Sequence, residues 1–130
     1  MGLLARGRNT SRNILLIEDD VDIRDIIKDA LEWEGYHVYT ASNGKEGMEM
    51  LAEMPAPCLI LLDLMMPVMN GWEFADAIET NRSYAQIPIV TISAFSDPEK
   101  RIRANGSIKK PVDLDLLFAL VRQYCGSGKC

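Results

Sequence analysis

The sequence has little histidine and no excess of positive charge. Its 130 residues include one histidine, and 14 lysines and arginines stand against 19 aspartates and glutamates, which gives a formal net charge of -5. Nucleic acids and anionic membranes attract clustered lysine and arginine, so this balance argues against both as partners. We therefore expect the protein to act through another protein, with no nucleic-acid and no membrane partner.

Long apolar runs are missing as well. No stretch approaches roughly 18 uninterrupted apolar residues, the length at which a helix can span a membrane. The leader MGLLARGRNTSRN has no long apolar segment and no small-residue cleavage pattern, so it indicates a flexible basic arm and not a secretory signal. These absences predict a cytoplasmic protein.

Cysteine is scarce, and its three positions lack the spacing of a metal or redox motif. Cys58, Cys125 and Cys130 form neither a Cys-x-x-Cys pair nor a Cys/His cluster. Cys58 begins an apolar run, and an unpaired cysteine in such a run packs as a small hydrophobic residue. The sequence thus favours a buried core thiol at Cys58 over a ligand or a redox site.

Short apolar runs alternate with segments in which apolar residues recur every three or four positions. After the first run, for example, Ile23, Ile26 and Leu31 place one apolar stripe on a helix. This alternation is typical of a parallel sheet covered by helices on both faces. The sequence therefore predicts one α/β domain with a doubly wound, five-stranded parallel sheet. The expected strands cover residues 13–17, 37–40, 58–62, 88–92 and 107–109.

Capping residues bound the predicted helices. Gly35 ends the first helix, and Asn43 with Glu46 forms a capping box for the second. Asp113 caps the last helix. Between the fourth and fifth strands there is room for only a short, loosely held helix, with Asp97 as its cap.

Acidic side chains follow two of the predicted strands. Glu18, Asp19 and Asp20 come directly after the first strand, and Asp63 comes directly after the third. Ligands of such sheets gather outside the carboxyl ends of the strands, so adjacent central strands would bring these acids into one crevice. Clustered carboxylates need protons or a cation, and oxygen ligands favour Mg²⁺ or Mn²⁺. Two plainer roles stay open, a solvated helix start for the first three acids and a capping role for Asp63.

A hydroxyl and an ammonium group complete the predicted site. Ser93 stands just after the fourth strand and Lys110 just after the fifth. There, the hydroxyl would donate to a phosphoryl oxygen, and the ammonium would pair with Asp63 or with the phosphate. The Lys110-Pro111 bond also permits a cis peptide, which would direct the lysine into the crevice.

Over residues 12–124 the chain resembles the receiver domain of two-component response regulators. The matching segments are ILLIEDD, ILLDLMMPVMNG, PIVTISA and KKP, in that order. The resemblance implies a flavodoxin-like fold with strand order 2-1-3-4-5, flanked by flexible residues 1–11 and 125–130. It also implies a histidine kinase or histidine phosphotransfer protein as the donor, and a downstream protein target that the sequence does not identify. Such a domain would catalyse only its own phosphorylation and dephosphorylation, as a monomer or as a phosphorylation-dependent dimer.

The same resemblance assigns roles to the acids. It implies that Asp63 accepts a phosphoryl group. It further implies that Asp19 binds Mg²⁺ directly, with Mn²⁺ as a substitute, and that Glu18 binds the ion through water. The backbone carbonyl of Met65 would be a further ligand, and Asp20 would only cap a helix.

The chain departs from the family pattern between Ser93 and Lys110. By resemblance, Ser93 is the switch hydroxyl and Lys110 the family's lysine, but the segment between them is shorter than the norm by about one helical turn. The family usually has an aromatic residue three positions before the lysine. In this chain that position is occupied by Ser107. We expect a shortened fourth helix, and a conformational switch that relies on the loop after the fourth strand.

Two other functions stay open. A metal-dependent phosphohydrolase that forms an aspartyl phosphate typically needs a second acid two residues after the nucleophile, and here that residue is Met65. A pseudo-receiver that serves only as a protein-binding scaffold would not need Asp63, Ser93 and Lys110 together.

Overall fold

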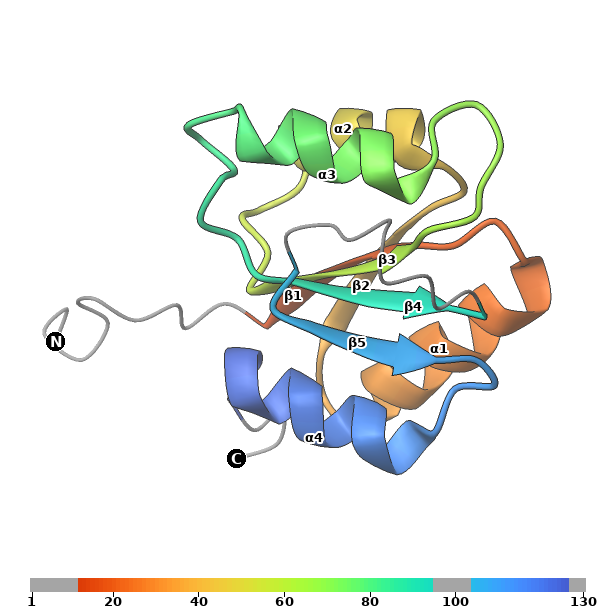
Figure 1. Ribbon diagram of the computed structural model, residues 1–130. Helices are drawn as coiled ribbons and strands as arrows, with labels where there is room; N and C mark the ends of the chain where they lie inside the picture. Colours follow the sequence, from red (N-terminus) through yellow and green to blue (C-terminus); the bar gives the residue numbers. More distant parts are fainter. Residues whose placement is uncertain (1–11, 95–103, 127–130) are drawn as a thin grey trace, which may run out of the picture.

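The computed structural model describes residues 12–94 and 104–126, and Figure 1 shows how their helices and strands are arranged. The strands are β1 (Asn13–Ile17), β2 (His37–Ala41), β3 (Leu59–Asp63), β4 (Ile89–Ser93) and β5 (Gly106–Lys109), and the helices are α1 (Val21–Trp33), α2 (Gly44–Glu53), α3 (Gly71–Glu79) and α4 (Leu114–Cys125). All strand pairs are parallel, and the order is β2-β1-β3-β4-β5. The predicted doubly wound, flavodoxin-like α/β fold is therefore confirmed.

The core has two layers, one on each face of the sheet. Helices α1 and α4 pack on one face and α2 and α3 on the other, as Figure 1 shows. Neighbouring residues of a strand point to opposite faces, so Leu15 belongs to the α2/α3 layer and Leu16 to the α1/α4 layer. The middle strand β3 is covered on both sides, and all five of its residues are buried. Its last residue, Asp63, is consequently fixed at the edge of a rigid core.

The bounds of β1 are the predicted ones, and those of the other four strands differ by one residue at one end or at both. Strands β3 and β4 each begin and end one residue later than expected, so Asp63 and Ser93 are the last residues of their strands. Helix α4 continues through Cys125, the first residue of the predicted C-terminal tail. Apolar content indicates where a strand lies, but ladder pairing with the neighbouring strand decides its last residue.

Two details of the helices correct the sequence predictions. The side chain of Asn43 accepts from the Glu46 N–H as predicted, but the Glu46 carboxylate accepts from Ser42 and so does not close a capping box on Asn43. A complete capping box instead begins α3, between Asn70 and Glu73. On α1 the predicted apolar stripe is narrower than expected, because Ile26 is 58% exposed.

Several predictions fall on residues that the structure does not describe. The short helix with Asp97 as its cap lies outside the described residues, and so do the leader 1–11 and the tail after Gly126. Within 12–94 and 104–126, no helix combines the length and the apolar character that crossing a membrane requires.

The prediction of a free core thiol at Cys58 is wrong. Cys58 is fully buried, as expected, but it forms a disulfide with Cys125 across 67 residues of sequence. Helix α4 runs antiparallel to the strands, and its last turn lies over the start of β3, which places the two Cα atoms 5.4 Å apart. Spacing along the sequence does not reveal a pairing that tertiary packing creates.

Candidate functional site

Three carboxylates meet at the carboxyl edge of the sheet. Glu18 directly follows β1, and its backbone N–H donates to the carbonyl of Ala41, which extends the pairing of β1 with β2 by one residue. Strand β3 lies on the other side of β1 and carries Asp63 at its end. Carboxylate oxygens of Glu18, Asp19 and Asp63 all lie within 4.8 Å of one another. Glu18 and Asp63 are buried, whereas Asp19 is exposed.

The ammonium group of Lys110 lies beside the two buried acids. Its Nζ is 3.1 Å from Glu18 Oε1 and 3.5 Å from Asp63 Oδ2. The residue follows β5, the Lys110-Pro111 peptide is cis, and the Lys110 N–H donates to the carbonyl of Ser93 at 3.0 Å. The sequence indicated a pairing with Asp63 or a phosphate, and it did not reveal that Glu18 is the closer partner. The complete burial of Glu18 is the missing information, because residue type alone does not predict it.

The other two predicted site residues lie close to this cluster along the chain and the sheet. Met65 is in the loop after β3, and its backbone N–H donates to Asp63 Oδ1 at 3.2 Å. Ser93 ends β4, one residue beyond Ile92, which pairs with Asp63 in the ladder, and its side chain is buried.

Asp20 stands apart from the cluster in its role. Its side chain accepts from the N–H groups of Asp22 and Ile23, so it is the N-cap of α1. This bears out the expectation that it caps the helix.

The loop between β3 and α3 packs tightly against the backbone of Asp63. The N–H of Gly71 donates to the carbonyl of Leu64, which brings the start of α3 against the end of β3. A Cβ atom on Gly71 would lie 2.7 Å from the carbonyl oxygen of Asp63 and 2.7 Å from the Cα atom of Leu64. Only glycine fits at this position without moving the backbone that carries the acid.

Replacing Gly71 by alanine should therefore destabilise the protein and distort the acidic cluster. Backbone atoms cannot move aside as a flexible side chain can, so we expect a loss of about 2 kcal/mol in the free energy of unfolding, measured by urea titration. Gly106→Ala is the matched control, because its Cβ would meet only side-chain atoms at 3.6 Å and 3.7 Å. Equal effects of the two substitutions would contradict this reading of the loop.

The same loop holds a strained backbone conformation at Val68. This β-branched residue has a φ of 68° and is 75% exposed. The left-handed region is unfavourable for a β-branched side chain and acceptable for asparagine. Val68 thus adopts its conformation at a cost that its own side chain does not offset by burial.

Val68→Asn should accordingly stabilise the protein by about 1 kcal/mol. The exposed Val21, in the first turn of α1, provides the control, because valine and asparagine have similar helix propensities. Thermal unfolding of both variants tests the prediction. A melting temperature that stays unchanged or falls in Val68→Asn would show that the loop does not carry this strain.

Negative charge is concentrated at the acidic cluster, where the pKa values of Asp63 and Lys110 are both raised. Burial, and then the hydrogen bond and charge of Glu18, raise the pKa of Asp63 to about 8, although the Met65 N–H acts in the opposite direction. Burial lowers the pKa of Lys110, but its bond to Glu18 and the charges of Asp63 and Glu18 outweigh this, so the pKa is raised overall. One ammonium group does not balance three carboxylates.

The donor set fits a hard divalent cation. Glu18 Oε1 is buried and accepts no hydrogen bond among the described residues, although it lies beside the charge of Lys110. Carboxylate oxygens from Asp19 and Asp63 lie within ligand reach of it. An all-oxygen set with one exposed member, through which water can enter, is what Mg²⁺ and Mn²⁺ prefer.

Comparison with known proteins agrees with this geometry. Residues 14–122 match the model of the response regulator receiver domain. One relative is an uncharacterised 14.6 kDa protein in the sodA1 3′ region of Leptolyngbya boryana, 36% identical over 118 residues, which are 87% of this chain and 89% of the relative. The chain spans only about half the length of several other curated relatives, which are named as transcriptional regulators.

Solved structures give the same result. The chemotaxis protein CheY4 of Vibrio cholerae matches with a TM-score of 0.80 and 28% identity, over 88% of this chain and 98% of CheY4. The Mn²⁺-bound form of the response regulator Rcp1 matches with a TM-score of 0.70 and 25% identity, over 85% of this chain and 89% of Rcp1. With its fold, its acidic cluster and the family match over residues 14–122, the chain belongs to the receiver domains of two-component response regulators.

Proposed function

We propose that Asp63 is the residue of this receiver domain that accepts the phosphoryl group. The observation that carries the proposal is the convergence of two further carboxylates and one ammonium group on Asp63. A carboxylate attacks phosphorus only when it is ionised and when charge on the phosphoryl oxygens is stabilised. The raised pKa of Asp63 means that the metal-free site holds a proton that has to leave before the attack.

Glu18, Asp19 and Asp63 hold Mg²⁺ in this proposal, together with the backbone carbonyl of Met65, and Mn²⁺ can replace Mg²⁺. When bound, the ion supplies positive charge that offsets the repulsion among the acids and withdraws charge from the phosphoryl oxygens. Lys110 gives a second positive charge, 3.5 Å from Asp63 Oδ2. Ser93 contributes a hydroxyl that donates to a phosphoryl oxygen.

The donor in this proposal is the phosphohistidine of a histidine kinase or of a histidine phosphotransfer protein in the cytoplasm. The Asp63 carboxylate attacks the phosphorus, the bond to the histidine nitrogen breaks, and the imidazole leaves with the electron pair. The domain catalyses only this transfer and the later hydrolysis of its own acyl phosphate. Phosphorylation then regulates a downstream protein, with the receiver acting as a monomer or as a phosphorylation-dependent dimer.

Phosphorylation by a small donor tests this proposal. Incubation with phosphoramidate and Mg²⁺ should add one phosphoryl group per chain, observed by intact-protein mass spectrometry, and EDTA should prevent the addition. Asp63→Asn should remove the signal. Asp76→Asn, at an exposed acid on α3, should leave it unchanged.

Two other outcomes would contradict the proposal. Continuous release of phosphate from the donor in large excess over protein would indicate a phosphohydrolase. No incorporation with Mg²⁺ or Mn²⁺, in a folded protein that also fails to bind beryllofluoride, would indicate a binding scaffold.

A further inference from the structure

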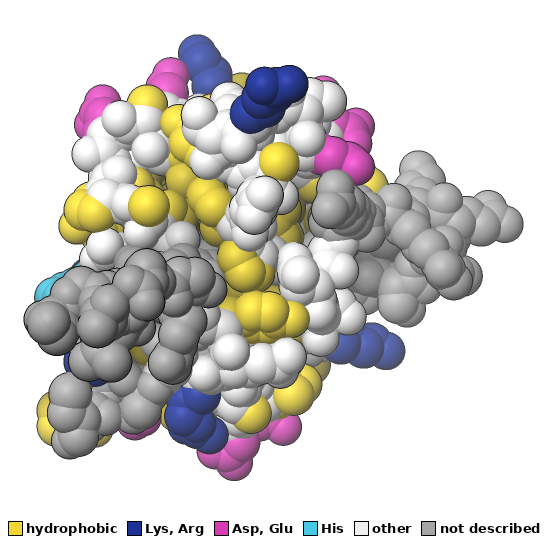
Figure 2. Space-filling view, turned by 90° about the vertical axis from the view of Figure 1, so that its left-hand side faces the viewer, with side chains coloured by type: hydrophobic (Ala, Val, Ile, Leu, Met, Phe, Trp, Pro, Cys, Tyr) yellow, Lys and Arg dark blue, Asp and Glu magenta, His cyan; other side chains and the backbone are white. Residues whose placement is uncertain are grey.

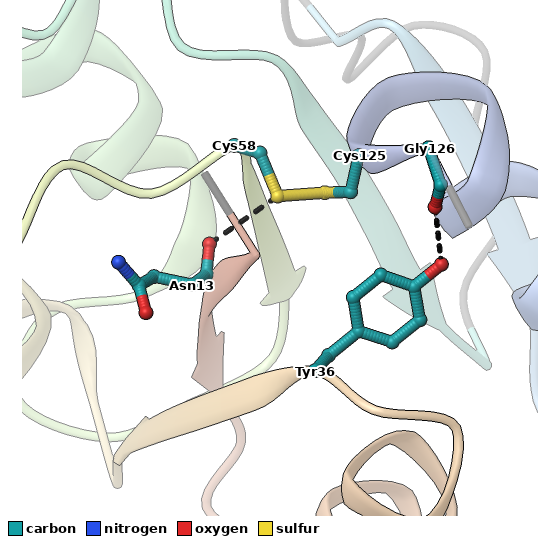
Figure 3. Close-up of a disulfide and its surroundings, with 5 residues drawn as sticks. All are labelled: Asn13, Tyr36, Cys58, Cys125 and Gly126. Carbon is teal, nitrogen blue, oxygen red and sulfur yellow. Dashed lines mark hydrogen bonds between the residues drawn. A yellow bond between two sulfur atoms is a disulfide. The ribbon is translucent and has the colours of Figure 1, made fainter. Parts of the chain in front are cut away.

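The disulfide lies at the opposite end of the sheet from the acidic cluster. Cys58 immediately precedes β3 and Cys125 is the last residue of α4, and Figure 3 shows the bond between them. This is the end at which the strands begin. Figure 2 views it directly, with hydrophobic side chains in a band across the middle and charged side chains nearer the rim. Receiver chemistry at Asp63 does not need a covalent bond here.

The chain on either side of the disulfide leads toward the acidic cluster. Strand β3 runs from the disulfide to Asp63, over about 16 Å at the usual rise of a strand. Helix α4 runs back from the segment after Lys110 to the disulfide, over about 18 Å at the usual rise of a helix. Opening the disulfide therefore frees the far end of α4 without removing a ligand or a charge from the cluster.

A second contact holds the same last turn of α4. The buried hydroxyl of Tyr36 donates to the carbonyl of Gly126, just after the helix, and Figure 3 shows this bond beside the disulfide. Tyr36, Val38 and Val121 pack together with both cysteines in one core cluster. The hydroxyl of Tyr124, in the same turn, also donates to the carbonyl of Asn105. When the disulfide opens, noncovalent contacts such as these hold the helix end without a covalent bond.

The fold also accommodates the reduced state. Cys58 Sγ lies 3.4 Å from the backbone carbonyl of Asn13, so a thiol at Cys58 has a hydrogen-bond acceptor without any rearrangement. Both cysteines are buried, at 0% and 6% exposed, and a neutral thiol suits such surroundings. Reduction therefore places a small neutral thiol with an acceptor at Cys58 and a second neutral thiol in apolar surroundings at Cys125.

We propose that Cys58 and Cys125 form a reversible redox site that fixes the C-terminal turn of α4 when oxidised and releases it when reduced. The reductant is a cellular thiol, of the dithiol-protein or glutathione class. Its thiolate attacks the sulfur of Cys125, the less buried of the two residues, and forms a mixed disulfide while Cys58 leaves as a thiolate. A second thiol of the reductant resolves the mixed disulfide, so two electrons and two protons reach the cysteine pair and the reductant becomes its own disulfide.

This redox site gives the receiver a second input that is independent of Asp63. Disulfides are rare where thiol buffers keep proteins reduced, and those that form there are usually transient or redox-sensing. The effect of opening the bond should be larger at the last turn of α4 than at any strand of the core.

Redox titration combined with hydrogen exchange tests the proposal. The wild-type protein is equilibrated in mixtures of reduced and oxidised glutathione, free thiols are counted by alkylation and mass spectrometry, and amide exchange is measured at both extremes. As the mixtures become more reducing, we expect the number of free thiols per chain to rise from one to three. Exchange at residues 121–126 should become at least about tenfold faster, while β1 and β3 stay protected.

Three variants separate the redox site from general effects. Cys130→Ser should behave like the wild type apart from having one thiol fewer. Cys125→Ser should show fast exchange at the end of α4 in both mixtures. Cys58→Ala should do the same, so the test does not depend on the folding of one variant, and Mg²⁺ binding serves as the check that the acidic cluster is intact.

Several results would overturn the proposal. A disulfide that persists in the most reducing mixture would be a fixed structural bond. Three free thiols in the most oxidising mixture would mean that the pair does not close. Equal exchange in both states, or loss of protection throughout the sheet on reduction, would show that the bond does not control the end of α4 alone. All of these outcomes are independent of phosphorylation, so they leave the role of Asp63 to its own test.

Discussion

Replacing Asp63 by asparagine is expected to raise the free energy of unfolding of the metal-free protein by about 3 kcal/mol at pH 8. Asparagine has nearly the shape of the protonated acid and carries no charge beside Glu18 and Asp19. The variant should lose phosphorylation and gain stability at the same time. An acid that stabilised the fold would show the opposite change.

The magnitude and its sign follow from the pKa of Asp63. Folding raises this pKa from 3.8 to about 8, mainly through burial and then through Glu18. The folded state therefore keeps a proton that the unfolded state loses, and the wild type loses stability as the pH rises from about 4 to about 8. One pKa unit corresponds to about 1.4 kcal/mol. Asp63 and Glu18 interact and titrate as a pair, so we assign roughly half of the full pKa shift to Asp63 alone.

Urea unfolding of wild type and Asp63→Asn in EDTA, at pH 5 and at pH 8, measures this effect. The difference between them should be small at pH 5, where Asp63 keeps its proton, and about 3 kcal/mol at pH 8. Asp76→Asn, on the exposed face of α3, should show no such pH dependence. Saturating Mg²⁺ should stabilise the wild type more than the variant, because in the proposed site the ion binds the native state through Asp63. If the difference in the free energy of unfolding between the two proteins did not change with pH, ionisation of Asp63 would not be the cause of the destabilisation.

The parts of the fold that could be predicted are those that local chemistry determines. Apolar runs such as CLILL predict buried strands, and the caps Asp20 and Asp113 predict helix starts, because each depends on neighbours in the sequence. The convergence of acids at the carboxyl edge was also predictable, since parallel strands place their ends together. The structure brings Glu18, Asp19 and Asp63 to one point, as this rule requires.

The parts that could not be predicted depend on contacts between distant segments. The pairing of Cys58 with Cys125 needs the position of the last turn of α4, which residue spacing does not give. The closer approach of Lys110 to Glu18 than to Asp63 depends on differences of a few tenths of an ångström. Likewise, Ile26 belongs to the apolar stripe that the sequence predicts for α1, but it is 58% exposed, because burial depends on how neighbouring segments pack against the helix.

Replacing Lys110 by methionine should have the largest effect on stability in the metal-free protein. Methionine keeps an apolar stem of similar length and removes the charge that lies 3.1 Å from buried Glu18 and 3.5 Å from Asp63. Removing one partner of a buried ion pair leaves an uncompensated charge, so we expect a loss of about 3 to 5 kcal/mol at pH 8. The pKa of Lys110 is raised above its usual 10.5, so the wild-type pair contributes throughout neutral pH and is lost only at more alkaline pH.

Mg²⁺ distinguishes this electrostatic effect from a packing defect. In Lys110→Met the cation supplies the missing positive charge, so saturating Mg²⁺ should restore a large part of the lost stability, measured by urea unfolding. Lowering the pH to 5 should restore part of it, because an acid of the cluster becomes protonated. Lys109→Met, at the exposed neighbouring position in β5, should change neither the stability nor its response to Mg²⁺. If Lys110→Met were equally destabilised with and without Mg²⁺, the lysine would act through its aliphatic packing. The charge balance on which the proposed phosphoryl transfer to Asp63 depends would then need another cation.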